Sequence, residues 1–304
     1  MFTLLLWELR REFWQHRATF IVLPAATAGF VIASLLLVFL GLMSGGEISL
    51  NIEVSGKRMD SLAGFLQSFA QMSEFDRNQR LGMLLRVVAW PMGAVLWLVV
   101  VLYLLGTLYD ERKDRSLLFW KSLPVPDWMC VLSKLLTAGL AVPLIYLVVT
   151  MIAQLVALAL LATWIATDEP DSTALWSSVW SASGIIGQWG LQLASTLFHL
   201  LWSLPFLAWL LLVSAWVRSV PLVWAVIVPL GLSIVDSIFG SGQIVGRWLF
   251  NHGLPMGHLT ELNEGGSLAA LQERLFSVDF VVAVAFGGVL LAGAWLMRGR
   301  ADEI

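Results

Sequence analysis

Six long apolar stretches constrain the fold of this chain more than any other feature of its sequence. A helix needs about 20 mostly apolar residues to cross the roughly 30 Å hydrocarbon core of a bilayer, because each residue adds about 1.5 Å. All six stretches meet this length, so the sequence predicts an all-α integral membrane protein with six transmembrane helices in one domain, 1–304. The predicted spans are 18–42, 87–108, 135–165, 190–217, 221–239 and 278–297.

The composition excludes several other classes of protein. Hydrophobic residues make up 59% of the chain and charged residues 13%, whereas soluble domains have about 25% charged residues. The 16 tryptophans suit a membrane interface, where an indole has both an apolar and a polar neighbourhood. A net charge of −3 gives no footprint for nucleic acid, and the single cysteine, Cys130, forms no intrachain disulfide.

Prolines are expected to interrupt some of the spans. The third span is long enough to need a tilt or a break near Pro143. The fourth and fifth form a tight hairpin, and Pro205, Pro221 and Pro229 are positioned to kink or end helices there.

The distribution of basic residues predicts the topology. Lysines and arginines near the span ends favour the side of the two termini, whereas the acidic residues concentrate in the longer loops of the other side. Both termini and the loop 109–130 are therefore expected to be cytoplasmic, and 43–86 and 240–277 to lie outside. Within the first outer segment, 61–72 has helical periodicity with Asp60 or Ser61 as a cap, which suits a helix on the membrane face or a lid.

The first 17 residues are predicted to form an amphipathic helix at the inner leaflet, with arginine and tryptophan at headgroup depth. Polar side chains that include Glu8, Arg11 and Glu12 fall between the apolar ones, and the apolar run that follows is longer than that of a secretory signal. The apolar positions are Phe2, Leu5, Leu6, Leu9, Phe13 and Phe20.

Catalytic motifs are not found in the sequence. There is no G-x-x-x-x-G-K-[ST] nucleotide loop and no H-E-x-x-H, so an enzyme is not predicted. His252, His258 and Glu261 fit no strong metal-binding spacing, and no metal is expected. Two ionisable residues fall inside predicted spans, His199 and Asp236, and each suits either a translocation path or a structural role.

A dense cluster of both charge signs, "YDERKDRSLLFWKSLPVPD", separates the second and third spans. Phe119 and Trp120 stand among the charges, Pro124 and Pro126 follow, and Asp127 is placed to cap the next helix. Topology signalling explains this poorly, because acidic residues contribute little to it. Docking of a cytoplasmic protein explains it better, with charges that set the register and aromatic anchors that fill a pocket.

The sequence combines an N-terminal amphipathic helix, six predicted spans, the lack of a nucleotide site and the segments "DERKDRSLLFWKSLPV" and "SAWVRSVPLVWAVIVP". In these features, the chain resembles the permease subunit of bacterial ABC transporters of the ABC-2 type. The resemblance implies a type V exporter-like fold in the bacterial inner membrane, a second permease copy or homologue, and two copies of a cytoplasmic ABC ATPase that holds ATP and Mg. The exported substrate would be an amphiphile such as a peptide, an antibiotic, a lipid or a lipid-linked molecule. The outer re-entrant helices typical before the last span of this family are not obvious in 240–277.

The resemblance also implies roles for particular residues. A connecting helix that rests on the ATPase would include Glu8, Arg10, Arg11 and Trp14. A coupling helix would lie at 110–123, and the positions facing the ATPase would be Asp110, Glu111, Arg112, Lys113, Asp114, Arg115, Phe119, Trp120, Leu123 and Pro124. The chain itself would bind no cofactor.

Two other functions fit parts of the sequence. An ion- or proton-coupled secondary transporter would need a network of intramembrane carboxylates and internal repeats. A membrane sensor or complex component that does not transport would look the same in sequence, and partner and flux data would separate it from a permease.

Overall fold

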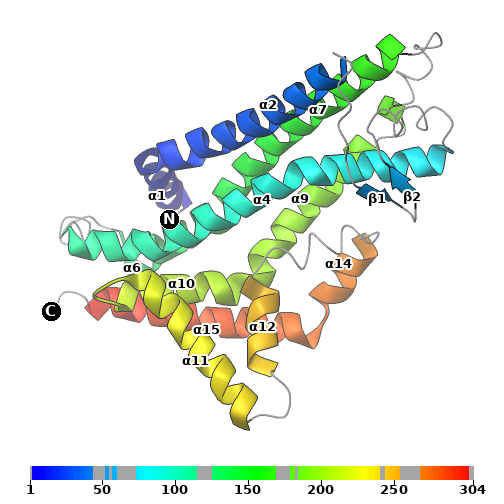
Figure 1. Ribbon diagram of the computed structural model, residues 1–304. Helices are drawn as coiled ribbons and strands as arrows, with labels where there is room; N and C mark the ends of the chain where they lie inside the picture. Colours follow the sequence, from blue (N-terminus) through cyan, green and yellow to red (C-terminus); the bar gives the residue numbers. More distant parts are fainter. Residues whose placement is uncertain are drawn as a thin grey trace. The chain divides into compact units, whose positions relative to one another are not determined.

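The computed structural model consists of helices and one short β-hairpin (Figure 1). It describes residues 2–43, 52–54, 57–59, 73–114, 125–168, 179–181, 184–239, 244–253 and 268–300. The chain divides into two compact units, each assembled from separate stretches: unit 1 comprises 1–22, 94–145 and 193–304, and unit 2 comprises 23–93 and 146–192.

Five helical segments in the described part are long and apolar enough to cross a membrane. A bent pair, Val179–Trp202 and Leu204–Trp216, adds a sixth span if it is counted as one, with an angle of 52° at the break. The prediction of a helical membrane protein is therefore confirmed, and the number of spans is five or six. The five are Ala18–Gly41, Phe75–Lys113, Asp127–Thr163, Pro221–Ile238 and Val278–Arg300.

Two of these segments contain π-helical turns. The π-helix η1 (Ala18–Val22) joins α1 (Phe2–Gln15) to α2 (Leu23–Met43), and η2 (Thr137–Ala141) joins α6 (Asp127–Leu136) to α7 (Val142–Asp168). The second turn ends two residues before Pro143, which donates no backbone hydrogen bond and crowds the preceding turn. The segment Asp127–Thr163 continues through this turn, so the irregularity near Pro143 is a π-helical turn within one span and not a break.

The helix α4 (Glu74–Lys113) is longer than the predicted second span. It begins 13 residues before position 87 because Ser73 caps it: the backbone N–H of Asp76 donates to Ser73 Oγ at 3.2 Å, and Ser73 Oγ donates to Asp76 Oδ2 at 2.7 Å. The first of these bonds is an N-cap bond, in which the serine oxygen accepts from a backbone N–H of the first helical turn. The helix expected at 61–72, with its cap at Asp60 or Ser61, lies outside the described residues.

Unit 2 is packed mainly through apolar side chains from α2, the first half of α4, α7 and the start of α9 (Ile185–Trp202). One cluster contains Leu81, Leu85, Leu158, Ala162 and Val179. A second contains Ala28, Val88, Met92, Ala153 and Ala157. The hairpin of β1 (Ile52–Val54) and β2 (Lys57–Met59) is antiparallel and also belongs to this unit.

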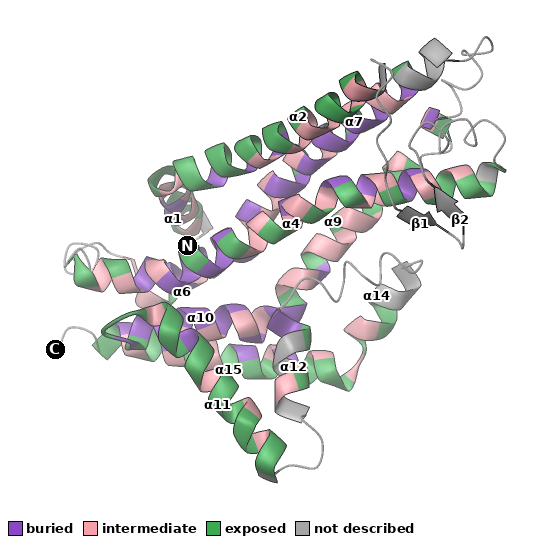
Figure 2. Ribbon diagram, in the orientation of Figure 1, coloured by how far each residue is buried: buried purple, intermediate pink, exposed green. Residues whose placement is uncertain are grey.

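Unit 1 is centred on the packing of α10 (Leu204–Trp216) against α15 (Val278–Arg300). Gly287 allows the close approach, because a Cβ there would lie 2.8 Å from Leu204 Cγ and 3.0 Å from Pro205 N. By contrast, α11 (Pro221–Phe239) exposes apolar side chains along its length (Figure 2). Two short helices, α12 (Ile244–Gly253) and α14 (Leu268–Leu275), precede α15.

Candidate functional site

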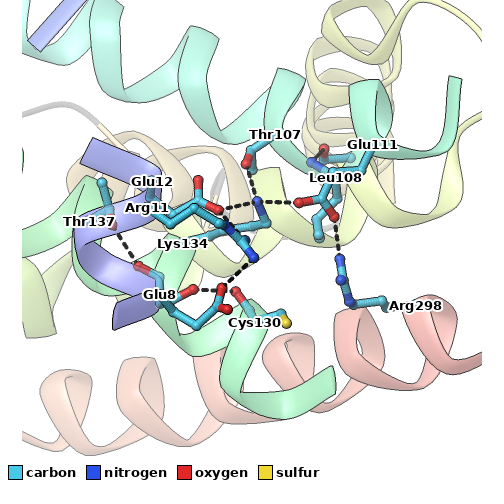
Figure 3. A network of polar contacts seen from close by, with 12 residues as sticks. Glu8, Arg11, Glu12, Thr107, Leu108, Glu111, Cys130, Lys134, Thr137 and Arg298 are labelled. Atoms are coloured by element: carbon cyan, nitrogen blue, oxygen red, sulfur yellow. Dashed lines mark hydrogen bonds and ion pairs between the residues drawn. The ribbon is translucent and has the colours of Figure 1, made fainter. Parts of the chain in front are cut away.

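A chain of buried ion pairs lies where four segments of unit 1 meet: α1, the end of α4, α6 and the end of α15 (Figure 3). Seven charged side chains follow one another with alternating sign, so each carboxylate has at least one cationic neighbour. In order, they are Glu8, Arg11, Glu12, Lys134, Glu111, Arg298 and Asp127. This set is called the charge chain below.

Lys134 is the centre of the charge chain. Its Nζ lies 2.8 Å from Glu12 Oε1, 2.8 Å from Glu111 Oε1 and 2.7 Å from Thr107 Oγ1. An ammonium group has three N–H donors, so these three acceptors satisfy it completely. The side chain is buried, and an ammonium group is stable in such a place only because it is paired and hydrogen-bonded.

Glu12 links the amino-terminal helix to this centre. Besides Lys134, it accepts hydrogen bonds from Arg11 Nη2 at 2.8 Å and from the Tyr103 hydroxyl at 2.7 Å. Burial alone would raise the pKa of Glu12, but the charge of Lys134 and the donated hydrogen bonds outweigh it and lower the pKa to about 2. Glu12 is therefore ionised at any physiological pH.

Arg298 closes the other end of the charge chain. Its Nη1 pairs with Glu111 Oε2, and its Nε donates to Asp127 Oδ1 at 3.1 Å. Asp127 was expected to cap α6, but this is wrong: Pro126 occupies the N-cap position and makes no side-chain cap bond, and Asp127 lies in the first turn. Its carboxylate faces a cation from α15 instead, which is the stronger available partner.

The amino-terminal helix turns its charged face toward the protein. Glu8 and Glu12 are buried, whereas Leu6 is 48%, Trp7 65% and Trp14 54% exposed. This is the reverse of a helix on a soluble protein, and it is the arrangement expected of a helix whose outer face meets lipid. The sequence pattern predicts the amphipathic helix, and the structure shows where its polar face goes.

The residues expected to contact an ATPase occupy different environments. Asp110, Lys113 and Asp114 are exposed, and Glu111 belongs to the charge chain. Arg112 donates to the backbone carbonyls of Ser214 and Val217, at the carboxyl end of α10. The remaining five, Arg115, Phe119, Trp120, Leu123 and Pro124, lie outside the described residues, so the interface stays a prediction.

The expected connecting-helix residues divide between the two faces of α1. Glu8 and Arg11 form an ion pair at 2.7 Å on the inner face. Arg10 and Trp14 are exposed. The structure thus brings Glu8 and Arg11 into the charge chain. It leaves Arg10 and Trp14 on the protein surface, where they can contact other molecules.

The two ionisable residues of the possible translocation path are not part of the charge chain. His199 on α9 and Asp236 on α11 are each half-buried. The His199 carbonyl accepts hydrogen bonds from Ser203 N at 2.8 Å and Ser203 Oγ at 2.6 Å, just before the bend between α9 and α10. Their part in transport stays a prediction.

The histidine-containing outer segment is only partly described. His252 is buried, with its ring centroid 4.5 Å from that of Trp202 and 4.3 Å from that of Trp248. His258 and Glu261 lie outside the described residues. In the part of the chain that the structure describes, no three His, Cys, Asp or Glu side chains are grouped to hold a metal ion.

The sequence reasoning missed the central residue of the site. In the sequence, Lys134 and Arg298 indicate only the topology. Glu12 is predicted only as part of the amphipathic helix, and Tyr103 and Thr107 only as parts of a span. One signal was available, because a lysine at the start of a long apolar stretch is costly unless it has a buried partner.

Comparison with protein-family models, with curated proteins and with solved structures gives no match. The resemblance to ABC-2 permeases therefore rests on the sequence pattern alone. Function has to be argued from the arrangement of the helices and from the charge chain.

Proposed function

We propose that the chain is the membrane-spanning permease subunit of an ABC transporter, which exports an amphiphile with energy from a separate cytoplasmic ATPase. The ATP and Mg would be held by that partner, since this sequence has no nucleotide loop of its own. Two permease chains, identical or homologous, would pair in the bacterial inner membrane with both termini in the cytoplasm.

The charge chain is the observation that carries this proposal. Glu111 lies near the start of the charged loop 109–130 and Asp127 near its end, and both pair with Arg298 of α15. Lys134 joins Glu111 to Glu12 of α1. A force applied to the loop by a partner would therefore reach α1, α4, α6 and α15 together, which is what a coupling element requires.

The helices between the fifth and sixth apolar segments give secondary support. The resemblance implies short outer helices before the last span, and α12 and α14 occur at that place in the sequence. Trp97 Nε1 donates to the Gly253 carbonyl at 2.8 Å and so ties the end of α12 to α4.

A second candidate is a proton-coupled transporter, because a buried carboxylate is the kind of group that can carry protons through a membrane. A proton carrier needs a group whose pKa lies near the working pH. The pKa of Glu12 is about 2, and its carboxylate is bonded to Lys134, Arg11 and Tyr103. This pairing suits a fixed structural charge better than one that takes up and releases protons.

The test is a pull-down of the tagged chain from native membranes in detergent, in parallel with the double variant Phe119→Ala/Trp120→Ala. We expect a P-loop ATPase to co-purify with the wild type. Loss of two aromatic anchors should weaken its binding at least roughly thirtyfold, since interface hot spots contribute about 2 kcal/mol or more each. The matched control is Phe30→Ala/Trp224→Ala, two exposed aromatic side chains far from the loop in sequence, which should retain the ATPase.

Absence of any ATPase from the wild-type preparation would contradict the proposal. Proton-dependent flux by the purified chain alone would then favour the second candidate. Charge reversals in the loop are best made at Lys113 and Arg115, because Arg112 bonds the end of α10 and its loss would disturb the fold.

A further inference from the structure

The outer face of α1 carries a repeated pair of side chains that the charge chain does not use. The motif W-x-x-R occurs at Trp7–Arg10 and again at Trp14–Arg17. The Arg10 guanidinium carbon lies 5.5 Å from the Trp7 ring centroid, and that of Arg17 lies 5.8 Å from the Trp14 ring centroid. Both contacts are in the range of a cation–π interaction.

The two pairs lie on one face of the helix. Seven residues separate them, which is nearly two helical turns and about 10.5 Å of axial rise. All four side chains are exposed. The buried residues Glu8 and Glu12 lie on the opposite face, toward Lys134.

The electrostatic character of this face differs from what the sequence suggests. Residues 8–17 contain two glutamates and three arginines, which gives a segment that is nearly neutral in sequence. The structure places both glutamates inside, where Arg11 and Lys134 pair with them. Among the described residues 3–19, the exposed charged side chains are Arg10 and Arg17, so the outer face is purely cationic.

We propose that the two W-x-x-R pairs form a binding surface for anionic phospholipid headgroups. Indoles favour the interface between headgroups and acyl chains. A guanidinium held on an indole face presents its remaining N–H donors to phosphate oxygens in bidentate geometry. The exposed Leu4 and Leu6 supply the apolar contact that such a helix makes with acyl chains.

A lipid fits this face better than a protein does. A docked protein would need complementary acidic side chains at both arginines, whereas an anionic leaflet presents phosphates along the whole helix. The proposal does not depend on the ABC assignment, because it needs no ATPase. The two can therefore fail separately.

The test is native mass spectrometry of the full chain in mixed micelles that contain phosphatidylglycerol and phosphatidylcholine. We expect the wild type to retain phosphatidylglycerol in preference to phosphatidylcholine. Each arginine near an anionic surface contributes roughly a fivefold change in affinity, so Arg10→Gln/Arg17→Gln should lower the preference roughly 25-fold. Arg10→Lys/Arg17→Lys should keep most of the charge effect and lose the bidentate contact.

The matched control removes two other exposed cations of unit 1, Arg218→Gln and Arg300→Gln. Retained phosphatidylglycerol preference in this control, together with its loss in Arg10→Gln/Arg17→Gln, would support the surface. Equal behaviour of the two double variants would overturn it. If Arg10→Gln/Arg17→Gln retains lipid like the wild type but loses a co-purified ATPase, the proposal is also overturned. That result would assign this face of α1 to a protein partner.

Discussion

Units 1 and 2 are stabilised in different ways. Ion pairs join four helical segments within unit 1, whereas the interior of unit 2 is mainly apolar. In unit 1, the charge chain buries Glu12, Lys134 and Arg298 among four helical segments. In the described part of unit 2, the buried polar side chains are Gln154 and Thr150, and leucine, valine and alanine fill the rest. Gln154 bridges two helices, since Nε2 donates to the Leu85 carbonyl at 3.0 Å and Oε1 accepts from Trp189 Nε1 at 2.8 Å.

Under the proposed function, this difference marks unit 1 as the part that would transmit motion from a partner. Apolar surfaces and neutral hydrogen bonds allow helices to shift by small steps at little cost. A buried ion pair allows only the geometry in which both charges are satisfied, because an unpaired charge in a dry site is very costly. The charge chain therefore suits a rigid connection between the two ends of the loop 109–130 and the helices around it.

The largest effect is expected from Lys134→Met, which leaves Glu12 and Glu111 without their shared cation. Loss of one partner from a buried pair costs about 3–5 kcal/mol. The unfolding temperature in detergent should fall sharply, and α1 should become more accessible to protease. Lys113→Met removes an exposed lysine from the end of α4 and should leave both readouts near wild type. Equal stability of the two variants would contradict the ionic account of unit 1.

A smaller effect is expected from Gly287→Ala, which tests packing within unit 1. The added Cβ would meet the backbone and side chain of Leu204 and the nitrogen of Pro205, so α10 and α15 would have to separate. Overpacking of this kind costs about 1–3 kcal/mol. The neighbouring Gly288→Ala has nothing within 4 Å and should be neutral or stabilising in the same thermal assay. A stable Gly287→Ala variant would show that the helix contact is looser than described.

Gln154→Leu is the corresponding test in unit 2. It removes two neutral hydrogen bonds, and the expected loss is about 1–2 kcal/mol, well below that of Lys134→Met. Thr150→Val is the control, because the Thr150 hydroxyl bonds only to the Tyr146 carbonyl of its own helix in the structure, at 2.7 Å. Denaturation in detergent measures both. A loss for Gln154→Leu as large as that for Lys134→Met would remove the contrast between the units.

The smallest effect is expected from mild acid. The pKa of Glu12 is about 2 in the fold against an ordinary value of 4.5, so its ion pairs stabilise the protein fully above pH 4.5. That stabilisation is lost as the pH falls from 4.5 toward 2. Between about pH 8 and about pH 5.5, this site should contribute no change in unfolding temperature. Glu12→Gln should show a smaller drop between neutral and strongly acidic pH than the wild type, and an equal drop would contradict the assignment.

Apolar length and proline position allowed much of the fold to be predicted from the sequence. The fifth span, 221–239, coincides with α11, and a π-helical turn lies close to Pro143, where the sequence predicts a tilt or a break. These features depend on local composition. The bend between α9 and α10 falls at Pro205, where the sequence predicts a kink or a helix end. The early start of α4 was not predicted, because it depends on Ser73, a single residue within a longer pattern.

The candidate site was predictable only in part. The sequence predicts that α1 is amphipathic and shows that 109–130 is rich in charges of both signs. It does not show that Glu12 and Lys134, 122 positions apart, share an ion pair. Partner choice among charges depends on tertiary contacts. Glu111 illustrates the point: it lies in a run of exposed charges, and its own side chain turns inward to Lys134 and Arg298.

A double-mutant cycle across Glu12 and Lys134 tests the charge chain most directly. The unfolding free energy would be measured in detergent for Glu12→Gln, for Lys134→Met and for both together. The account predicts strong coupling: each single variant leaves a buried charge without this partner, whereas the double variant removes both charges. The double variant should therefore be more stable than the sum of the single losses implies. Additive losses would contradict it, because they would show that the two charges do not depend on each other.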